Sequence, residues 1–362
     1  MKIFQQLINS PSQWVKEEGP EANIVFSSRV RLARNIQGFV FPPWASNSEL
    51  KKVSTEILEA AGKSKYFKVS SVIDIEKLSF LERRFLLERH LISDEFVDNG
   101  KYRFLVATEG EIISLMINEE DHLRLQSILP GLQLMEAWKL SDKVDNDLEE
   151  YLNYAFSPQR GYLTSCPTNV GTGMRASCMI HLPSLVATNR IRDVLKGVSQ
   201  LGLITRGLYG EGTSSRGDFF QISNQVTLGL KEEQILNSVE RVTRRVVEEE
   251  KRAREVLLKN NSAKIKDEIG RAYGILTNAY LISSEEALQL LSKIRLGIGL
   301  GFLSGLKIGI LNELFILIEP AQIQIMEGKS LNPFSRDRTR AKIIKEKLTI
   351  HPPGQMHGCM DA

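Results

Sequence analysis

The segment LTSCPTNVGTGMRASCMIHL at residues 163–182 carries the pattern on which the fold of this chain depends. Its part from Cys166 to Arg175 places a cysteine, a proline, two glycines and an arginine within ten positions. Glycines let backbone amides approach an oxyanion closely, and an arginine adds a full positive charge with two parallel donors. The segment therefore indicates either a phosphate-binding loop or a tight turn that leads into an apolar strand at 174–182.

A dinucleotide-binding fold is excluded by the strand-like run after these glycines. Gly171, Gly173 and Ala176 formally satisfy the relaxed glycine pattern of that fold. The pattern has its meaning only between a strand and a helix. Because a strand rather than a helix is predicted after the glycines, we reject a Rossmann fold.

The composition allows two domains and argues against a nucleic-acid-binding protein. The chain has 362 residues, of which 47 are basic and 44 acidic, for a net charge of +3. Domains commonly hold ~100–200 residues, so two fit this length. A dedicated nucleic-acid-binding protein presents a concentrated basic surface rather than mixed charges. We therefore expect no direct contact with nucleic acid.

The cysteines, the amino terminus and the hydropathy predict a cytoplasmic protein that does not enter a membrane. Cys166, Cys178 and Cys359 form an odd set without a Cys-x-x-Cys motif, so we expect neither structural disulfides nor a metal site. The amino-terminal apolar run is short and lacks a cleavage site for secretion. The most apolar region, 296–318, contains Lys307 and Glu313. It therefore predicts a buried helical hairpin rather than a membrane span.

Two stretches ahead of the central segment concentrate charge on predicted strands. Residues 24–34 alternate apolar and polar positions, which predicts a strand with Arg29 and Arg31 on one face. Two adjacent arginines repel each other unless an anion lies between them, which favours a phosphate site over a solvated strand face. Residues 102–108 and 111–118 predict a hairpin, and the acidic run NEEDHLR lies at 118–124. Three successive carboxylates need cations nearby or a strand end open to water, and a simple acidic turn is the alternative.

Helices are predicted from capping boxes and from helical periodicity. Ser46 with Glu49 and Ser79 with Glu82 each predict the start of a helix. In the second of these helices we expect the arginines at 83, 84 and 89 to be solvated.

A long charged helix is predicted at 231–258, and the Asn-Asn-Ser run at 260–262 is predicted to break it. The chain reads as helical from there to residue 350. We therefore place a catalytic domain at 1–258, a helical C-terminal domain at 259–350 and a disordered tail at 351–362.

The central segment closely resembles the signature of the ATP:guanidino phosphotransferases, the family of creatine and arginine kinases. The run at 118–124 resembles the second signature of that family, and the segments 27–31 and 206–211 are similar to two more of its motifs. The resemblance implies an α+β fold. Its catalytic domain would be phosphagen-kinase-like, an antiparallel sheet flanked by helices as in glutamine synthetase, and an all-helical domain would come after it.

The resemblance also assigns residues and cofactors. It implies ATP and Mg²⁺, the catalytic residues Glu120, Glu211 and Cys166, and the phosphate-binding residues Ser27, Arg29, Arg31, Arg124, Arg175 and Arg206. Many family members have an arginine where this chain has Tyr209, so that contact does not carry over. A guanidinium is a poor nucleophile because it is protonated and delocalised. Two carboxylates and a thiolate suit the tasks of gripping it and removing a proton.

The class of acceptor is implied by a further resemblance. Family members that act on free guanidino compounds carry a helical domain ahead of the first arginine motif, whereas only 26 residues precede Ser27. The layout resembles the protein-arginine kinases of the family, whose open site admits arginine side chains of proteins. This implies protein substrates marked for the Clp chaperone-protease, an McsA-type activator and a homodimer. It also implies a regulatory phosphoarginine site at Arg336, Asp337 and Arg340, for which an exposed basic helix start is the alternative.

Two other functions stay open on the sequence alone. One is a kinase of a small guanidino metabolite. The other is a catalytically silent adaptor that binds phosphoarginine or DNA through the C-terminal domain. The intact Glu120, Glu211 and Cys166 argue against the adaptor.

Overall fold

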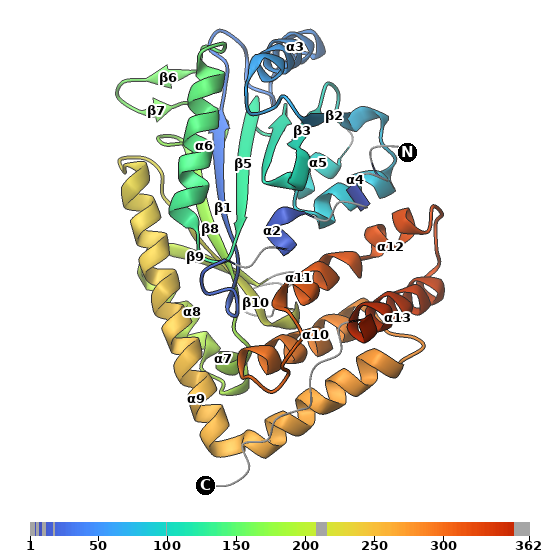
Figure 1. Cartoon of the computed structure of the whole chain (residues 1–362). Coiled ribbons are helices and arrows are strands. Elements are labelled where there is room, and N and C mark those ends of the chain that lie inside the picture. Colours follow the sequence, from blue (N-terminus) through green and yellow to red (C-terminus); the bar gives the residue numbers. More distant parts are fainter. Residues whose placement is uncertain are drawn as a thin grey trace.

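The computed structural model describes residues 4, 7–8, 12–16, 19–98, 100–207 and 216–350. These residues form an antiparallel sheet of eight strands in the order β2-β3-β4-β5-β1-β8-β10-β9, with a small β6-β7 ribbon beside it (Figure 1). The strands are β1 (Val25–Arg34), β2 (Ser70–Asp74), β3 (Phe104–Thr108), β4 (Ile113–Ile117), β5 (Leu123–Pro130), β6 (Phe156–Ser157), β7 (Gly161–Tyr162), β8 (Met174–His181), β9 (Leu203–Gly207) and β10 (Phe219–Asn224). The α+β class with an antiparallel sheet is confirmed.

The inner strand β1 separates the core of the protein from its charged face. It pairs with β5 on one side and with β8 on the other. Val30 and Leu32 are buried in one cluster with Val144 of α6 (Leu134–Glu149). Since side chains alternate along a strand, Arg29 and Arg31 lie on the opposite face. The predicted strand and its arginine face are therefore confirmed.

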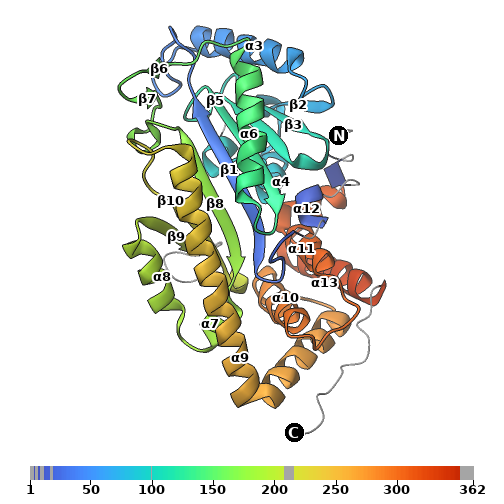
Figure 2. The same ribbon diagram turned by 60° about the vertical axis from the view of Figure 1, so that its left-hand side comes forward.

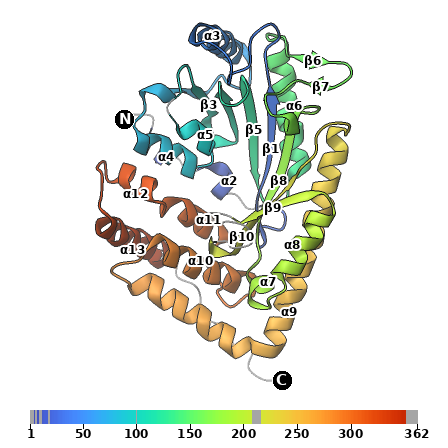
Figure 3. The ribbon, with the colours of Figure 1, turned by 180° about the vertical axis from the view of Figure 1, so that it is seen from behind.

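Helices cover both faces of the sheet. The α6 face also carries α3 (Asn47–Lys63), α8 (Ile191–Gln200) and the first half of α9 (Glu232–Asn278) (Figure 1). Seen from behind, the other face carries short helices and the C-terminal helices (Figure 3). These are α2 (Gln13–Lys16), α4 (Phe80–Glu88), α5 (Asp94–Val97), α10 (Ser284–Gly299), α11 (Ile308–Leu317), α12 (Pro320–Met326) and α13 (Pro333–Ile350), while α7 (Pro183–Ala187) lies beside α9.

Capping residues fix where the predicted helices begin. The Ser46 hydroxyl accepts from the Glu49 amide at 3.3 Å, and the Glu49 carboxylate accepts from the Ser46 amide at 2.9 Å. Ser79 and Glu82 make the same reciprocal pair at the start of α4. Each box satisfies amides that the first helical turn leaves without a partner.

Helix α9 is broken where the sequence predicts a break. It continues through Asn261, which has non-helical angles of φ −143° and ψ 26°, and Figures 1 and 2 show a sharp bend there. The second half packs with α10, α11 and α13 around a core that includes Leu276, Leu291 and Ile344. The predicted break at 260–262 is thus confirmed as a kink between two helical halves, and the domain division at residue 258 stays a prediction.

The apolar run at 296–318 contributes to that core as the end of α10, a connecting loop and α11. Leu311 and Leu314 are fully buried, so the predicted buried hairpin of helices is confirmed. Within the described residues no single helix has the length and hydropathy of a membrane span; α11 and α12 pass that test only together, and they are bent by 84°.

The prediction of solvated arginines at 83, 84 and 89 was wrong for Arg83 and Arg89. Arg89 is 2% exposed, and its Nη2 lies 2.5 Å from Oε1 of Glu111. The other carboxylate oxygen of Glu111 accepts a hydrogen bond from the Ser12 hydroxyl. Arg83 is buried as well, while Arg84 is half-buried at the wall of a large cavity. A buried ion pair is stable when both partners are satisfied, as they are here.

Candidate active site

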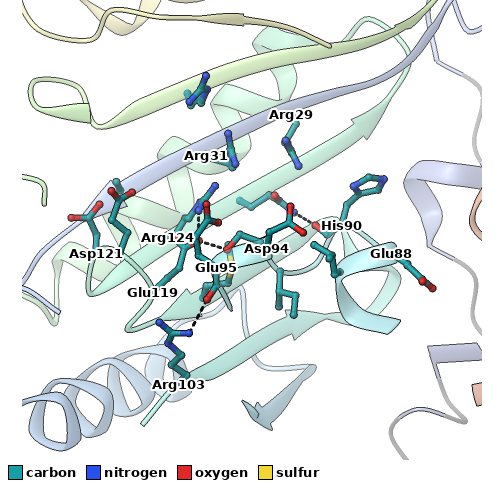
Figure 4. Close-up of a pocket in the computed structure, with 18 of the residues that line it drawn as sticks. Arg29, Arg31, Glu88, His90, Asp94, Glu95, Arg103, Glu119, Asp121 and Arg124 are labelled. Carbon is teal, nitrogen blue, oxygen red and sulfur yellow. Dashed lines mark hydrogen bonds and ion pairs between the residues drawn. The ribbon is translucent and has the colours of Figure 1, made fainter. Parts of the chain in front are cut away.

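A cavity of about 1040 Å³ lies on the face of the sheet that carries Arg29 and Arg31. Its walls combine arginines from several strands with carboxylates from the β4–β5 turn and from α4 and α5 (Figure 4). The charged side chains that line it include Arg29, Arg31, Arg124, Arg175, Arg206, Asp94, Glu95, Glu119, Glu120 and Asp121. The cavity thus has both cationic and anionic side chains in its wall.

The arginines come from four strands that lie close together in the sheet. Arg29 and Arg31 stand on β1, Arg124 on β5, Arg175 on β8 and Arg206 on β9. Arg31 is the direct cross-strand partner of Arg175, and Ala33 that of Arg124. Directly opposed residues have side chains about 4.5–5.5 Å apart at Cβ. The sheet therefore gathers like charges that would repel one another without an anion.

Three of these arginines, Arg29, Arg31 and Arg175, repel one another, and Arg31 and Arg175 have unused donors. Burial, together with repulsion from Arg124 and Arg175, lowers the pKa of Arg29 to about 10. Burial and repulsion from Arg124, Arg29 and Arg175 lower the pKa of Arg31 well below its ordinary value. Within the described part of the chain, the buried Nε atoms of Arg31 and Arg175 have no hydrogen-bond partner. Buried donors are nearly always paired, so these point to an acceptor supplied by a ligand.

Arg124 differs because it has a carboxylate partner. It forms an ion pair with Glu119, which also accepts a hydrogen bond from Ser93. Burial alone would lower the pKa of Arg124, but attraction to Glu119 raises it. Burial alone would raise the pKa of Glu119, but Arg124 and Ser93 lower it. Glu119 thus neutralises one arginine of the cluster and leaves the others for a ligand.

Glu120 is an exposed carboxylate of the cavity, as are Asp94 and Glu95 of α5. It has no hydrogen-bond or ion-pair partner among the residues that the structure describes, although it lies between two buried acids. Partial burial, together with the charges of Asp121 and Glu119, raises its pKa above the ordinary value. A carboxylate with a raised pKa and a free face can accept both a cation and a proton.

The turn that carries Glu120 is fixed by its neighbours. Asn118 has a φ of 59°, a left-handed conformation that asparagine tolerates. Its Nδ2 donates to the carbonyl oxygens of Leu50 and Tyr102, at 2.9 Å each. Asp121 Oδ1 accepts from Asn35 Nδ2 at 2.6 Å and from the Ser165 amide at 2.7 Å. The Asp121 carboxylate therefore joins the turn to the loop of Cys166.

His122 fastens a second loop to the same turn. Its Nδ1 accepts from the Ile36 amide at 3.0 Å, so the proton lies on Nε2, which donates to the Val40 carbonyl at 3.1 Å. Burial lowers the pKa of His122 to about 4, so the ring is neutral near pH 7. This histidine holds backbone and does not act on a substrate.

The glycines of the central segment serve packing in this structure. Gly173 has a φ of 62°, and a Cβ there would lie 2.5 Å from the Ala33 carbonyl oxygen. At Gly171, with φ 113°, a Cβ would lie 2.7 Å from the Thr227 carbonyl oxygen. Only glycine accommodates both the conformation and the close approach. The loop is thus pressed against β1 and the segment after β10.

The structure brings most of the predicted site residues together. Glu120 and the five arginines that were predicted to bind phosphate line one cavity. Cys166 does not line this cavity; it is half-buried in the loop that contributes Asn169 to the lining, with Sγ 3.0 Å from Thr168 Oγ1. Ser27 is buried and lines a separate small cavity with Arg29. Glu211 and Tyr209 lie outside the described residues.

The predicted regulatory motif lies on α13, and its residues do not line this cavity. Arg340 is 1% exposed, and it donates from Nε to the Ile318 carbonyl at 2.9 Å and from Nη1 to the Ile282 carbonyl at 2.9 Å. Nη1 also donates to Asp337 Oδ1 at 2.6 Å. Arg336 donates to the Leu331 carbonyl at 2.9 Å. The alternative of an exposed basic helix start is therefore wrong for Arg340.

Several residues that shape the site were not predicted from the sequence. Asn35 and Asp121 join the loops, and Arg34 donates to Asp145 Oδ2 at 2.7 Å and to the Thr172 carbonyl at 3.0 Å. His90 lines the cavity beside Arg29, and burial lowers its pKa to about 4. No local pattern signals the pair of Arg34 and Asp145, because the two residues are separated by 111 positions.

Comparison with known proteins identifies the family. The sequence matches the model of the ATP:guanido phosphotransferase C-terminal catalytic domain over residues 49–253 and that of the protein-arginine kinase McsB C-terminal domain over residues 262–357. It is 46% identical to the protein-arginine kinase of Halothermothrix orenii over 348 aligned residues. The alignment covers 96% of this chain and 99% of that protein. The chain belongs to the protein-arginine kinases. These form part of the ATP:guanidino phosphotransferase family.

Other relatives agree with this assignment. The protein-arginine kinase of Moorella thermoacetica is 45% identical over 340 residues, 93% of this chain and 97% of that protein. Among solved structures, the duplicated taurocyamine kinase from Schistosoma mansoni, with bound transition-state-analog components, matches with a TM-score of 0.58 and 27% identity. That match covers 67% of this chain and 35% of the duplicated protein, so the chain spans about a third of its length. The protein-arginine kinase fold described here is thus phosphagen-kinase-like.

Proposed function

We propose that this member of the protein-arginine kinases transfers the γ-phosphoryl group of ATP to the guanidinium groups of arginine residues in proteins. The observation that carries the proposal is a cavity in which a cluster of arginines with unused donors faces the exposed Glu120. The cluster suits a polyanion, and the carboxylate suits a planar cation. The names of the relatives supply the acceptor class.

The arginine side of the cavity would hold the triphosphate. Phosphate oxygens between Arg29, Arg31 and Arg175 would accept from the unpaired donors and remove the repulsion between these side chains. Ser27 is proposed to contribute at this end through its position near Arg29 on β1. Arg124 and Arg206 complete the phosphate-binding set.

Mg²⁺ would enter with ATP as part of the substrate. Within the described residues no group of three or more His, Cys, Asp or Glu side chains is placed to hold a metal ion. This fits Mg²⁺, which keeps several water ligands and is held mainly by substrate phosphates and one or two carboxylates. When bound, the ion would neutralise charge on the β- and γ-phosphates.

The acidic side would orient the guanidinium. One guanidinium nitrogen attacks the γ-phosphorus, the bond from that phosphorus to the bridging oxygen breaks, and ADP leaves with that oxygen. The attacking nitrogen gives up one proton, which Glu120 or Glu211 accepts. A Cys166 thiolate is proposed to pair with the cation from the side. Because the chemistry of phosphoryl transfer demands little covalent assistance, positioning and charge supply most of the rate enhancement.

The wider context is proposed from the same family membership. We place the enzyme in the cytoplasm, with an McsA-type activator and with phosphorylated proteins passing to the Clp chaperone-protease. The C-terminal helical domain is proposed to form a homodimer and to bind phosphoarginine at Arg336, Asp337 and Arg340 as an allosteric site. The match of residues 262–357 to the McsB C-terminal domain supports these assignments.

A labelling experiment tests the proposal. The protein is incubated with Mg-ATP and an arginine-rich protein, and the modified residues are located by mass spectrometry under conditions that preserve acid-labile phosphate. Phosphoarginine on the protein is the expected result. Phosphorylation of free arginine alone would instead support a small-metabolite kinase, and no transfer at all would support an adaptor.

A further inference from the structure

An unusual set of exposed apolar side chains lies at one end of the sheet. Trp44 is 69% exposed and Val40 45%, both on the loop between β1 and α3. Val226 and Leu228 are each 53% exposed and Leu230 42%, on the segment between β10 and α9. Together these five residues are named the apolar rim. Large exposed apolar groups gathered in one region commonly mark an interaction site.

Both segments leave the sheet at the end where Glu120 lies. β1 ends at Arg34, opposite Leu123 at the start of β5, and the turn of Glu120 immediately precedes Leu123. β10 ends at Asn224, whose side chain donates to the carbonyl of Met174 at the start of β8. Figure 1 shows the loop after β1 and the segment before α9 at this same upper end.

Each half of the apolar rim is fastened to one loop of the candidate active site. The Val40 carbonyl accepts from His122 Nε2 at 3.1 Å, which ties the Trp44 loop to the turn of Glu120. Thr227 Oγ1 lies 2.8 Å from the Thr168 carbonyl and 2.7 Å from that of Val170, which ties the second half to the Cys166 loop.

The apolar rim is also continuous with the cavity. Pro42 and Pro43, which immediately precede Trp44, line the cavity, and so does Asn169 of the Cys166 loop. An arginine side chain that reaches Glu120 therefore brings its own main chain to the mouth between these two loops. The residues beside it in an extended polypeptide would then lie against the apolar rim.

We infer that the apolar rim receives apolar side chains that flank the target arginine in an extended segment of the protein substrate. This inference rests on the proposed function. In an extended chain, residues two positions apart project to the same side and are separated by about 6.6 Å. A rim with apolar groups on both sides of the mouth fits such a segment, whereas free arginine would leave it uncovered. Arginines within apolar sequence, accessible when a protein is unfolded, become the preferred substrates.

The test compares two peptides that differ only two positions before and two positions after a central arginine, where one has leucine and the other has serine. Wild type is compared with Trp44→Ser and, as a second rim variant, Leu228→Ser. Phe80→Ser is the matched control, because Phe80 is 64% exposed and does not line the cavity. Phosphoarginine formation is measured as kcat/KM at saturating Mg-ATP, and the mass of each variant is measured by sedimentation.

Trp44→Ser is expected to lower kcat/KM for the leucine peptide on the order of tenfold, mainly through KM, because exposed aromatic anchors dominate such contacts. The serine peptide should change by less than about twofold, and Phe80→Ser should change neither. The inference would be overturned if Trp44→Ser lowered kcat/KM equally for both peptides or for neither. A change of mass in Trp44→Ser would also overturn it, because the apolar rim would then be a contact between copies of the chain. If wild type phosphorylates neither peptide nor any protein, the proposed function itself fails, which is a different result.

Discussion

Asp121→Ala should uncouple the two active-site loops, because one carboxylate oxygen holds them together. Asp121 is 2% exposed, and its Oδ1 accepts from Asn35 and from the Ser165 amide. Alanine leaves the Ser165 amide without this acceptor, while Asn35 Nδ2 keeps the Leu163 carbonyl at 3.1 Å. One unpaired donor costs ~1–3 kcal/mol, and losing a charged acceptor adds to this. We expect the free energy of unfolding to fall by about 2–4 kcal/mol.

The effect on activity should fall on turnover rather than on nucleotide binding. A displacement of the Glu120 turn relative to Cys166 by ~1 Å is enough to cost on the order of 10²-fold in kcat. KM for ATP should change by less than about threefold, because the arginines proposed to bind phosphate stand on strands, whereas the substitution lies in a turn. Urea denaturation measures the loss of stability, and steady-state phosphorylation of an arginine-rich protein measures kcat and KM.

Two further variants separate the causes. Asp121→Asn keeps an oxygen that can accept from Ser165, so it should retain most of the stability and much of the turnover. Asp267→Ala is the surface control, since Asp267 forms an exposed pair with Arg271 and should change stability by less than ~0.5 kcal/mol. Wild-type kcat in Asp121→Ala, or equal damage in Asp121→Asn, would refute the role given to this hydrogen-bonded link.

Arg31→Ala should weaken ATP binding by about 10-fold or more, measured by calorimetry, without lowering the free energy of unfolding, since it removes a half-buried cation whose buried Nε has no partner. Arg34→Ala should instead lower the free energy of unfolding by about 3–5 kcal/mol in urea denaturation, because it leaves its buried partner Asp145 unpaired. A loss of stability in Arg31→Ala would count against an anion site. The raised pKa of Glu120 means that its base form is lost as pH falls through that pKa, so kcat should decline on the acid side. In Asp121→Asn this decline should shift to lower pH, because a neighbouring negative charge is gone; a pH–rate profile that does not move contradicts this. In urea denaturation, Gly173→Ala should lower the free energy of unfolding by ~1 kcal/mol or more beyond the loss in Gly229→Ala. Both glycines have a positive φ, but only at Gly173 would a Cβ contact backbone atoms. Equal losses of stability would contradict the close approach at Gly173.

Local signals in the sequence predicted local structure well. Strand β1 was found from its alternation, and the capping boxes at Ser46 and Ser79 placed the starts of α3 and α4 to the residue. These features depend on neighbours within a few positions. The predicted break of the long helix is confirmed, because the Asn-Asn-Ser run weakens the helix and the chain bends at Asn261. Packing on both sides of Asn261 keeps the two halves helical.

Contacts between residues far apart in the chain could not be predicted from the sequence. Arg89 was expected in solvent because its helix is rich in charge, yet Glu111, 22 positions away, pairs with it in the interior. Motif resemblance placed Glu120 and the arginines in one site, and the shared cavity agrees. Resemblance did not supply the scaffold of Asn35, Asp121 and His122, since those contacts arise only after β1, β5 and the Cys166 loop are assembled.

The most direct test of the central claim separates nucleotide binding from transfer in Glu120→Gln. Glutamine keeps the size of the side chain and removes its charge and basicity, while the arginine cluster stays intact. ATP affinity measured by calorimetry should stay within about threefold of wild type, and single-turnover formation of phosphoarginine on an arginine-rich protein should fall by ~10²-fold or more. Phosphoarginine formed at the wild-type rate would contradict the assignment of Glu120 and, with it, the division of the cavity into a phosphate side and a guanidinium side.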